Sequence, residues 1–196
     1  MQHTRVLLPL IKAAFAKTDH TLQDCAGVAV SDGPGSYTAL RAGLSSAKGI
    51  CLALDVPLLQ VSTLRALATV ALEARAPEAP PVREVLSVLV ARRRQLYAAR
   101  YGPDGEVSQA PHTLEADEAW AERLRGEGGV LVVGPEAQGV AERFDEFVEH
   151  ANVTLEARNL LTLSAFMYRE GAFAELGAAV PLYLKPPHIT VAKPKF

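Results

Sequence analysis

Cysteine is scarce in this sequence, and its two copies form no motif. Among 196 residues, Cys25 and Cys51 stand far apart, without CxxC spacing. A disulfide framework or a zinc site requires more thiols at defined spacing, so both are predicted to be buried free thiols in a reducing compartment. Pro9 and Lys12 interrupt the first apolar stretch, and no apolar run reaches the roughly 18 residues that span a bilayer. These absences favour a cytoplasmic protein.

The sequence also lacks an excess of positive or negative residues. The 20 lysines and arginines against 22 acidic residues give a formal net charge of -2, which provides no general attraction to nucleic acid or membranes. The run Arg92–Arg94 falls at a predicted hairpin turn, and Lys185, Lys193 and Lys195 make the end of the chain basic. These basic groups predict at most an accessory contact with RNA.

Sequence motifs for metal binding or nucleophilic catalysis are lacking as well. The five histidines show neither HExxH nor HxxxH spacing, which argues against a metal site: His3, His20, His112, His150 and His188. Ser36 and Ser62 follow predicted strands but lie outside any GxSxG motif, so helix capping explains them better than nucleophilic catalysis.

What the chain does have is a hydrophobic fraction of 49%, distributed in alternating strand and helix patterns. Such alternation with short connections predicts an α/β architecture with a partly parallel sheet, in one domain or two small lobes. The three prolines of Ala76–Val82 mark a boundary between lobes. Helices are predicted at Thr4–Phe15, Tyr37–Leu54, Ser62–Arg75, Ala116–Arg125, Glu136–Phe147 and Leu160–Leu176, and strands at Gly27–Ser31, Leu58–Val61, Val85–Ala91, Gln95–Tyr101, Glu106–Gln109 and Val130–Val133.

The stretch SDGPGSYTALRAG, residues 31–43, is the clearest local signal. A glycine turn between a strand and a helix can bind a phosphate through free backbone N–H groups and the helix dipole. However, the GxxxxGK[ST] and GxGxxG patterns are absent, Pro34 removes one donor, and Arg41 is the nearby cation. We therefore favour a turn that starts the helix, with Ser36 or Thr38 as the cap, over a phosphate site.

The helix that follows this turn is apolar or small on nearly all sides. One stripe contains Leu40, Leu44, Ala47, Cys51 and Leu54, and a neighbouring stripe contains Ala39, Gly43, Ser46, Ile50 and Ala53. A helix of this kind must be covered on most faces, and its small residues allow close approach of another helix. From the residues alone, a central core helix is favoured over a partner interface.

Four segments together resemble one known family. The run GVAVSDGPGSYTALRAGLSSAKGICLALDVPLLQVSTLRALA (27–68) closely resembles the characteristic segment of the TsaB (YeaZ) family of bacterial tRNA threonylcarbamoyladenosine synthesis. HTRVLLPLI (3–11) is similar to the first helix of the family, ARRRQLYAARY (91–101) to its hairpin, and VPLYLK (180–185) to its terminal strand motif.

The resemblance implies an ASKHA (actin-like ATPase/sugar kinase) fold of two lobes, residues 1–76 and 77–196, whose last helix could return to the first lobe. It implies a non-catalytic subunit that binds TsaD and TsaE in the complex that adds threonylcarbamoyl to the adenosine beside the anticodon of ANN-decoding tRNAs. It implies contact with tRNA only through the complex, no cofactor in this chain, and leaves open a nucleotide at the subunit junction. By the resemblance, the helix-start loop is Gly33, Pro34, Gly35, Ser36 and Thr38, and the partner-binding residues are Leu7, Leu10, Ile11, Ala39, Leu40, Gly43, Ala47 and Ile50.

The sequence departs from the family at its amino terminus. Family members begin with a β-meander, whereas Met1 here stands directly before the first helix, so we expect a truncated first lobe and a native chain with those strands upstream. Asp32, Ala39 and Val90 are milder departures. Two alternatives stay open: a glycoprotease-like peptidase, and a homodimer that pairs through the same helices. Gly43→Glu or Ala47→Arg would be expected to abolish binding of TsaD.

Overall fold

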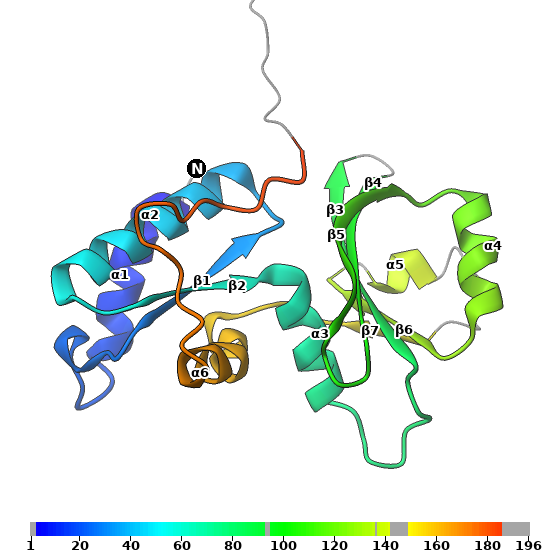
Figure 1. Ribbon diagram of the computed structural model, residues 1–196, viewed down its shortest axis with the longest axis horizontal. Helices are drawn as coiled ribbons and strands as arrows, with labels where there is room; N and C mark the ends of the chain where they lie inside the picture. The colour runs from blue at the N-terminus through cyan, green and yellow to red at the C-terminus, as the bar shows by residue number, and fades with distance from the viewer. Residues whose placement is uncertain (1–2, 93–94, 136, 142–148, 186–196) are drawn as a thin grey trace, which may run out of the picture.

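Two β-sheets, each covered by helices, organise the chain in a computed structural model that describes residues 3–92, 95–135, 137–141 and 149–185 (Figure 1). The first sheet pairs two parallel strands, β1 and β2. The elements of this part are α1 (His3–Phe15), the short helix η1 (Leu22–Asp24), β1 (Val28–Gly33), α2 (Tyr37–Leu54), β2 (Leu58–Ser62) and α3 (Thr63–Glu73).

The second sheet has five strands in the order β5-β4-β3-β6-β7. The strands β3, β4 and β5 form the predicted antiparallel meander, whereas β6 and β7 run parallel to β3. The elements are β3 (Glu84–Arg92), β4 (Gln95–Tyr101), β5 (Val107–Glu115), α4 (Glu118–Glu127), β6 (Val130–Gly134), α5 (Ala137–Ala141), β7 (Glu149–Asn152), η3 (Ala157–Leu160) and α6 (Leu161–Arg169).

Alternation along the strands divides the hydrophobic core into layers. On β1, Val28 and Val30 pack in the cluster that contains α2, while Ala29 packs on the other side with Leu163 of α6. In the second sheet, Leu86 and Val88 face α4, and the intervening strand positions face α3. Successive side chains of a strand point to opposite faces, so each sheet buries apolar residues on both sides.

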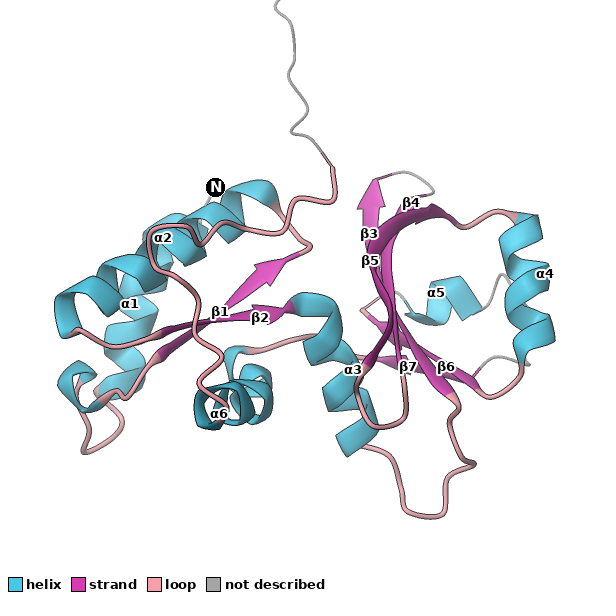
Figure 2. Ribbon diagram, in the orientation of Figure 1, coloured by secondary structure: helices cyan, strands magenta, loops and turns pink. Residues whose placement is uncertain are grey.

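The segment after α6 crosses from the first sheet toward the second as an extended chain (Figure 2). Ala174 forms a β-bridge with Leu58, the Gln60 side chain donates to Val180 O at 2.9 Å, and the Lys185 ammonium contacts the Gln95 amide oxygen of β4. Residues 174–185, which we call the C-terminal strap, therefore contact both sheets.

Most predicted elements are confirmed, and α2 has its predicted bounds. The helix predicted for Leu160–Leu176 is wrong beyond Arg169, because Gly171 adopts φ 67 and the chain leaves the helix there. The terminal motif of residues 180–185 is not a strand. Strand β5 runs six residues further than expected, and β7 was not predicted. The predicted helix Glu136–Phe147 lies largely outside the described residues, as do Arg93, Arg94, Lys193 and Lys195.

Candidate protein-interaction site

Helices α1 and α2 carry large apolar side chains in contact with solvent. Helix α1 packs against α2, and α2 in turn packs on β1. On α1, Leu8 is 53% and Leu10 61% exposed, while Leu52 near the end of α2 is 76% exposed, the largest value among the exposed large hydrophobic residues of the described chain. Single exposed leucines are common, but three on two neighbouring helices make this helix pair a candidate region for protein contact.

The residues that sequence analysis assigned to a partner interface divide into three groups. Leu10 and Ala39 are exposed, as an interface in solution requires. The half-buried group turns partly into the molecule: Leu7, Ile11, Leu40, Gly43 and Ile50. Ala47 is only 5% exposed and belongs to the core cluster with Leu44 and Cys51, so in the free chain its side chain faces the core and not the solvent.

The geometry of Gly43 shows why the small residues of α2 did not reveal which face of the helix meets a partner. A Cβ atom added at Gly43 would lie 3.5 Å from Cγ2 of Val30 on β1, so this glycine faces the chain's own sheet. Small residues on this face allow α2 to approach β1 closely. Leu8 and Leu52 were not assigned to the interface, although their apolar character outside the buried stripe was a signal that could have identified them.

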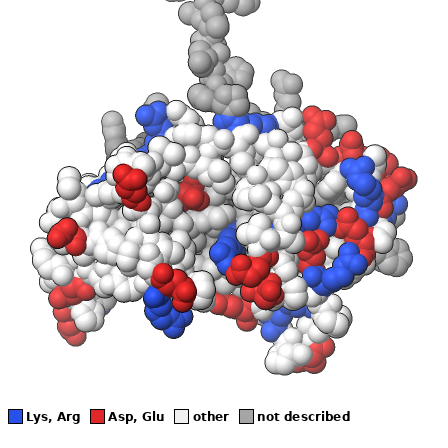
Figure 3. Space-filling model, viewed as in Figure 1, with Lys and Arg blue, Asp and Glu red and all other residues white. Residues whose placement is uncertain are grey.

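On the face of the molecule shown in Figure 3, charged side chains are distributed unevenly. In Figure 3, the half that carries α2 shows mostly uncharged atoms, whereas the half that carries the second sheet shows acidic and basic side chains interspersed. Charged residues are depleted at the centre of protein interfaces, so on this face the half with fewer charged side chains is the better candidate for a protein contact.

The loop Gly33–Thr38 connects β1 to α2 and anchors the C-terminal strap. The Leu182 N–H donates to Asp32 O at 2.8 Å, and a Cβ added at Gly33 would lie 3.0 Å from Leu182 O. Gly33 also has a φ of 117°, so both this backbone conformation and the close approach of Leu182 favour glycine at this position. Pro34 is buried, and Gly35 and Thr38 are exposed. Ser36 occupies the N-cap position, but its side chain makes no capping hydrogen bond, so the predicted side-chain cap is wrong.

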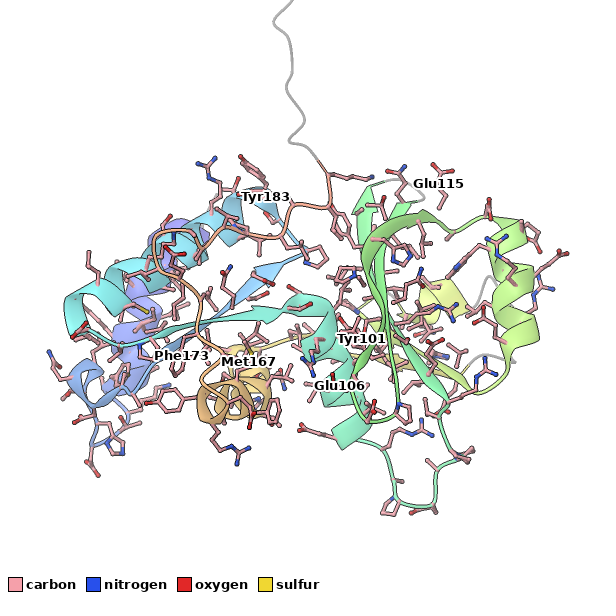
Figure 4. All side chains as sticks on the ribbon, in the orientation of Figure 1. Tyr101, Glu106, Glu115, Met167, Phe173 and Tyr183 are labelled. Carbon is pink, nitrogen blue, oxygen red and sulfur yellow. The ribbon has the colours of Figure 1, made fainter. Side chains whose placement is uncertain are left out.

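Two tyrosines, which sequence analysis did not identify, hold the strap on the start of α2. The rings of Tyr37 and Tyr183 stack with centroids 4.9 Å apart, and the Arg41 guanidinium donates to the Tyr37 hydroxyl at 2.9 Å. Figure 4 places Tyr183 over the beginning of α2. The loop therefore positions the strap as well as the helix.

We expect Tyr183→Ala to lower the free energy of unfolding by about 1–2 kcal/mol, because it removes a stacked aromatic pair and its apolar contact area. Tyr183→Phe, which keeps the ring, should remain close to the wild type. Urea unfolding followed by circular dichroism measures both variants. An alanine variant as stable as the wild type would contradict an anchoring role for the stack.

Catalytic groupings are not evident in the part of the chain that the structure describes. No three histidine, cysteine or acidic side chains come close enough there to hold a metal ion. The described side-chain hydrogen bonds join no serine, threonine or cysteine to a histidine ring; Ser31 instead pairs with Thr63 at 2.5 Å. None of the described helices is long and apolar enough to cross a lipid bilayer.

The chain is similar in sequence to proteins of tRNA threonylcarbamoyladenosine synthesis. A family model described as "TsaD: tRNA N6-adenosine threonylcarbamoyltransferase" matches residues 1–124. The tRNA threonylcarbamoyladenosine biosynthesis protein TsaB of Escherichia coli (strain K12) is 27% identical over 192 residues, covering 94% of this chain and 81% of that protein.

Solved structures give the same fold. The structure described as YeaZ from Pseudomonas aeruginosa superposes with a TM-score of 0.74 at 26% identity, over 93% of this chain and 84% of that one. A second structure, described as an uncharacterized protein with similarity to peptidase YEAZ from the same organism, has a TM-score of 0.77 at 24% identity, over 92% and 83%.

The structural similarity shows that the chain is an α/β protein with the YeaZ fold. The chain belongs to the family described by the TsaD model, and its resemblance to TsaB (YeaZ) proteins is confirmed.

Proposed function

We propose that the chain is a non-catalytic subunit of the machinery that makes threonylcarbamoyladenosine in tRNA, and that it binds TsaD through the outer side of α1 and α2. The proposal includes an ASKHA-type fold in two lobes and TsaE as a further partner. The similarity to TsaB of Escherichia coli over 94% of the chain supports the pathway. The exposed leucines of α1 and α2 support a role in protein contact.

The observation that carries the proposal is the exposure of Leu8, Leu10 and Leu52 on neighbouring helices. Their burial against a partner would remove apolar surface from water, worth about 25 cal/mol per Å² before the costs of association. A helical partner surface of TsaD that presents apolar side chains would match them. The second sheet, with its many charges, remains outside this contact.

The test is to mix the purified chain with TsaD from the same organism. We expect a stable equimolar complex by size-exclusion chromatography with light scattering, and tRNA modification that requires the chain when TsaD, TsaE and the threonylcarbamoyl donor are supplied. Full modification in the absence of the chain would contradict a subunit role. Failure to form a complex would contradict the TsaD contact.

The same experiment examines the two alternatives. A homodimer would show a concentration-dependent mass in the absence of TsaD and would compete with the heterodimer for the same face. A peptidase would cleave TsaD or a model peptide by itself, and that activity would depend on a nucleophile or metal for which the described residues provide no arrangement.

A further inference from the structure

A hollow of about 570 Å³ lies between α4 and the meander of the second sheet. Alternate residues of β3, β4 and β5 face α4. On each of these strands the residues at one end are apolar and those at the other end are polar. Helix α4 covers the apolar part, where Trp120, Ala121 and Leu124 pack. The polar part, with Glu84, Arg100, Ser108 and His112, is left facing the hollow. This site is separate from the α1–α2 face and does not depend on the proposed function.

Arg100 is fixed at this hollow by two carboxylates. Its Nη1 donates to Glu84 at 2.6 Å and to Glu127 at 2.5 Å, and the Ser108 hydroxyl donates to the other oxygen of Glu84 at 2.5 Å. Burial opposes the charged form of Glu84, but the hydrogen bonds from Ser108 and Arg100 outweigh it and lower its pKa. The side chain of Arg100 is 15% exposed, so the guanidinium is held in one orientation before any ligand arrives.

Both ion pairs use the same nitrogen, which leaves one edge of the guanidinium available. Nη1 carries two of the five N–H groups, and both are used by Glu84 and Glu127. The other three belong to Nε and Nη2, which form the side-on edge that pairs with the two oxygens of a carboxylate or phosphate. The described residues make no hydrogen bond to Nε or Nη2, and Arg100 lines the hollow, so this edge is available to a ligand there.

The remaining lining suits a ligand with one anionic group and an apolar body. Arg123 lines the hollow and has no ion pair among the described residues. His112 Nδ1 lies 2.9 Å from Ala110 O, which can only accept, so Nδ1 carries the proton and Nε2 is the ring nitrogen left for a ligand. Leu86, Leu114 and Trp120 provide the apolar wall. Pockets of this size with a few convergent polar groups are typical of small-molecule sites.

We propose that this hollow binds a small molecule through a single carboxylate or phosphate group, held by the side-on edge of Arg100 with help from Arg123, while the apolar body of the ligand lies against Leu114 and Trp120. Glu84 and Glu127 offset the two arginines, so the site has no net positive charge. This balance selects against polyanions such as nucleic acid.

Trp120 is the only tryptophan of the chain, so its indole N–H gives one resonance that reports on the hollow. Benzoate and phenyl phosphate are titrated separately into the 15N-labelled chain, with benzamide as the neutral analogue. We expect a saturable shift of the indole signal with at least one of the two anions, and binding by benzamide at least about 10-fold weaker, because its amide cannot pair with two guanidinium donors. Comparison of the two anions identifies carboxylate or phosphate as the preferred group.

A set of variants distinguishes the contribution of the two-donor edge of Arg100 from the contribution of its positive charge. Arg100→Lys keeps a positive charge beside Glu84 and Glu127 but removes the two-donor edge, so we expect at least about 10-fold weaker binding. Arg123→Gln, at an exposed position, should weaken binding about 3- to 10-fold without a structural effect. Arg158→Gln, on η3, is the control and should change nothing. The proposal is overturned if neither anion gives a saturable shift, if benzamide binds as well as benzoate, or if Arg123→Gln and a folded Arg100→Lys both retain wild-type affinity.

Discussion

Leu10→Glu is expected to reduce the affinity of the chain for TsaD by about 100-fold or more. In the free chain Leu10 is 61% exposed, so the glutamate would be hydrated and the fold unaffected. In the complex the same carboxylate would lose its water against an apolar partner surface, at a cost of several kcal/mol. Truncation or charge at a central interface residue commonly costs more than about 2 kcal/mol, whereas rim positions cost little. Isothermal titration calorimetry with purified TsaD measures the change.

Leu52→Glu tests the other helix of the same surface, and we expect a loss of similar size because Leu52 is the more exposed of the two. The control is Leu161→Glu on α6, where the leucine is 65% exposed but lies on a helix that packs on the opposite face of the first sheet. It should bind TsaD as the wild type does. Equal affinity for all three variants would mean that α1 and α2 are not the contact surface.

Ala47→Arg, which the sequence suggested as an interface test, would measure folding instead. The Ala47 side chain is buried beside Leu44 and Cys51, so an arginine there would need to displace the core between α2 and β1. Overpacking of this kind typically costs about 1–3 kcal/mol, and the buried charge adds to it. Loss of TsaD binding by that variant would therefore carry no information about the interface.

The sequence predicted α2 accurately because several local signals agree there. A glycine turn precedes it, helix-forming residues fill it, and Asp55 with Pro57 ends it. The structure shows Asp55 in the left-handed conformation at the C-cap. The face that α2 presents to a partner could not be predicted in the same way. Small residues surround the helix, and only the tertiary contact of Gly43 with Val30 shows which side meets the sheet.

Strand β7 and the end of α6 were missed for different reasons. The β7 sequence, EHAN, is polar and short, and it forms a strand only because β6 offers a parallel edge. No local pattern identifies such a strand. The end of α6 did have a signal, since Gly171 follows Glu170 at the C-cap and adopts φ 67. The apolar residues beyond Gly171 continued the helical pattern in the sequence, although in the structure they lie outside the helix, and those from Ala174 onward belong to the strap.

Asp32→Asn is expected to stabilise the chain above about pH 7, by up to about 3 kcal/mol, and to have little effect below about pH 4. Burial raises the pKa of Asp32 from 3.8 to about 6, although a hydrogen bond from its own backbone amide opposes this, and its Oδ1 is buried without a hydrogen-bond partner. The native state thus holds the proton more tightly than the unfolded chain. The resulting stabilisation is complete below the unfolded pKa and is lost as the pH rises through about 6.

Urea unfolding at several pH values between about 4 and 8 checks this, because the free energies of the wild type and the Asn variant should separate as Asp32 ionises. Asp19→Asn, at an exposed position, is the control and should follow the wild type at every pH. A wild-type profile identical to that of Asp32→Asn would contradict an ionised, unpaired carboxylate at the end of β1. No positive charge among the described residues offsets the burial of Asp32, since desolvation and its own backbone hydrogen bond account for the shift of its pKa. The uncharged amide of Asn avoids the cost of burying a negative charge, which is the cost that separates the two proteins above about pH 7.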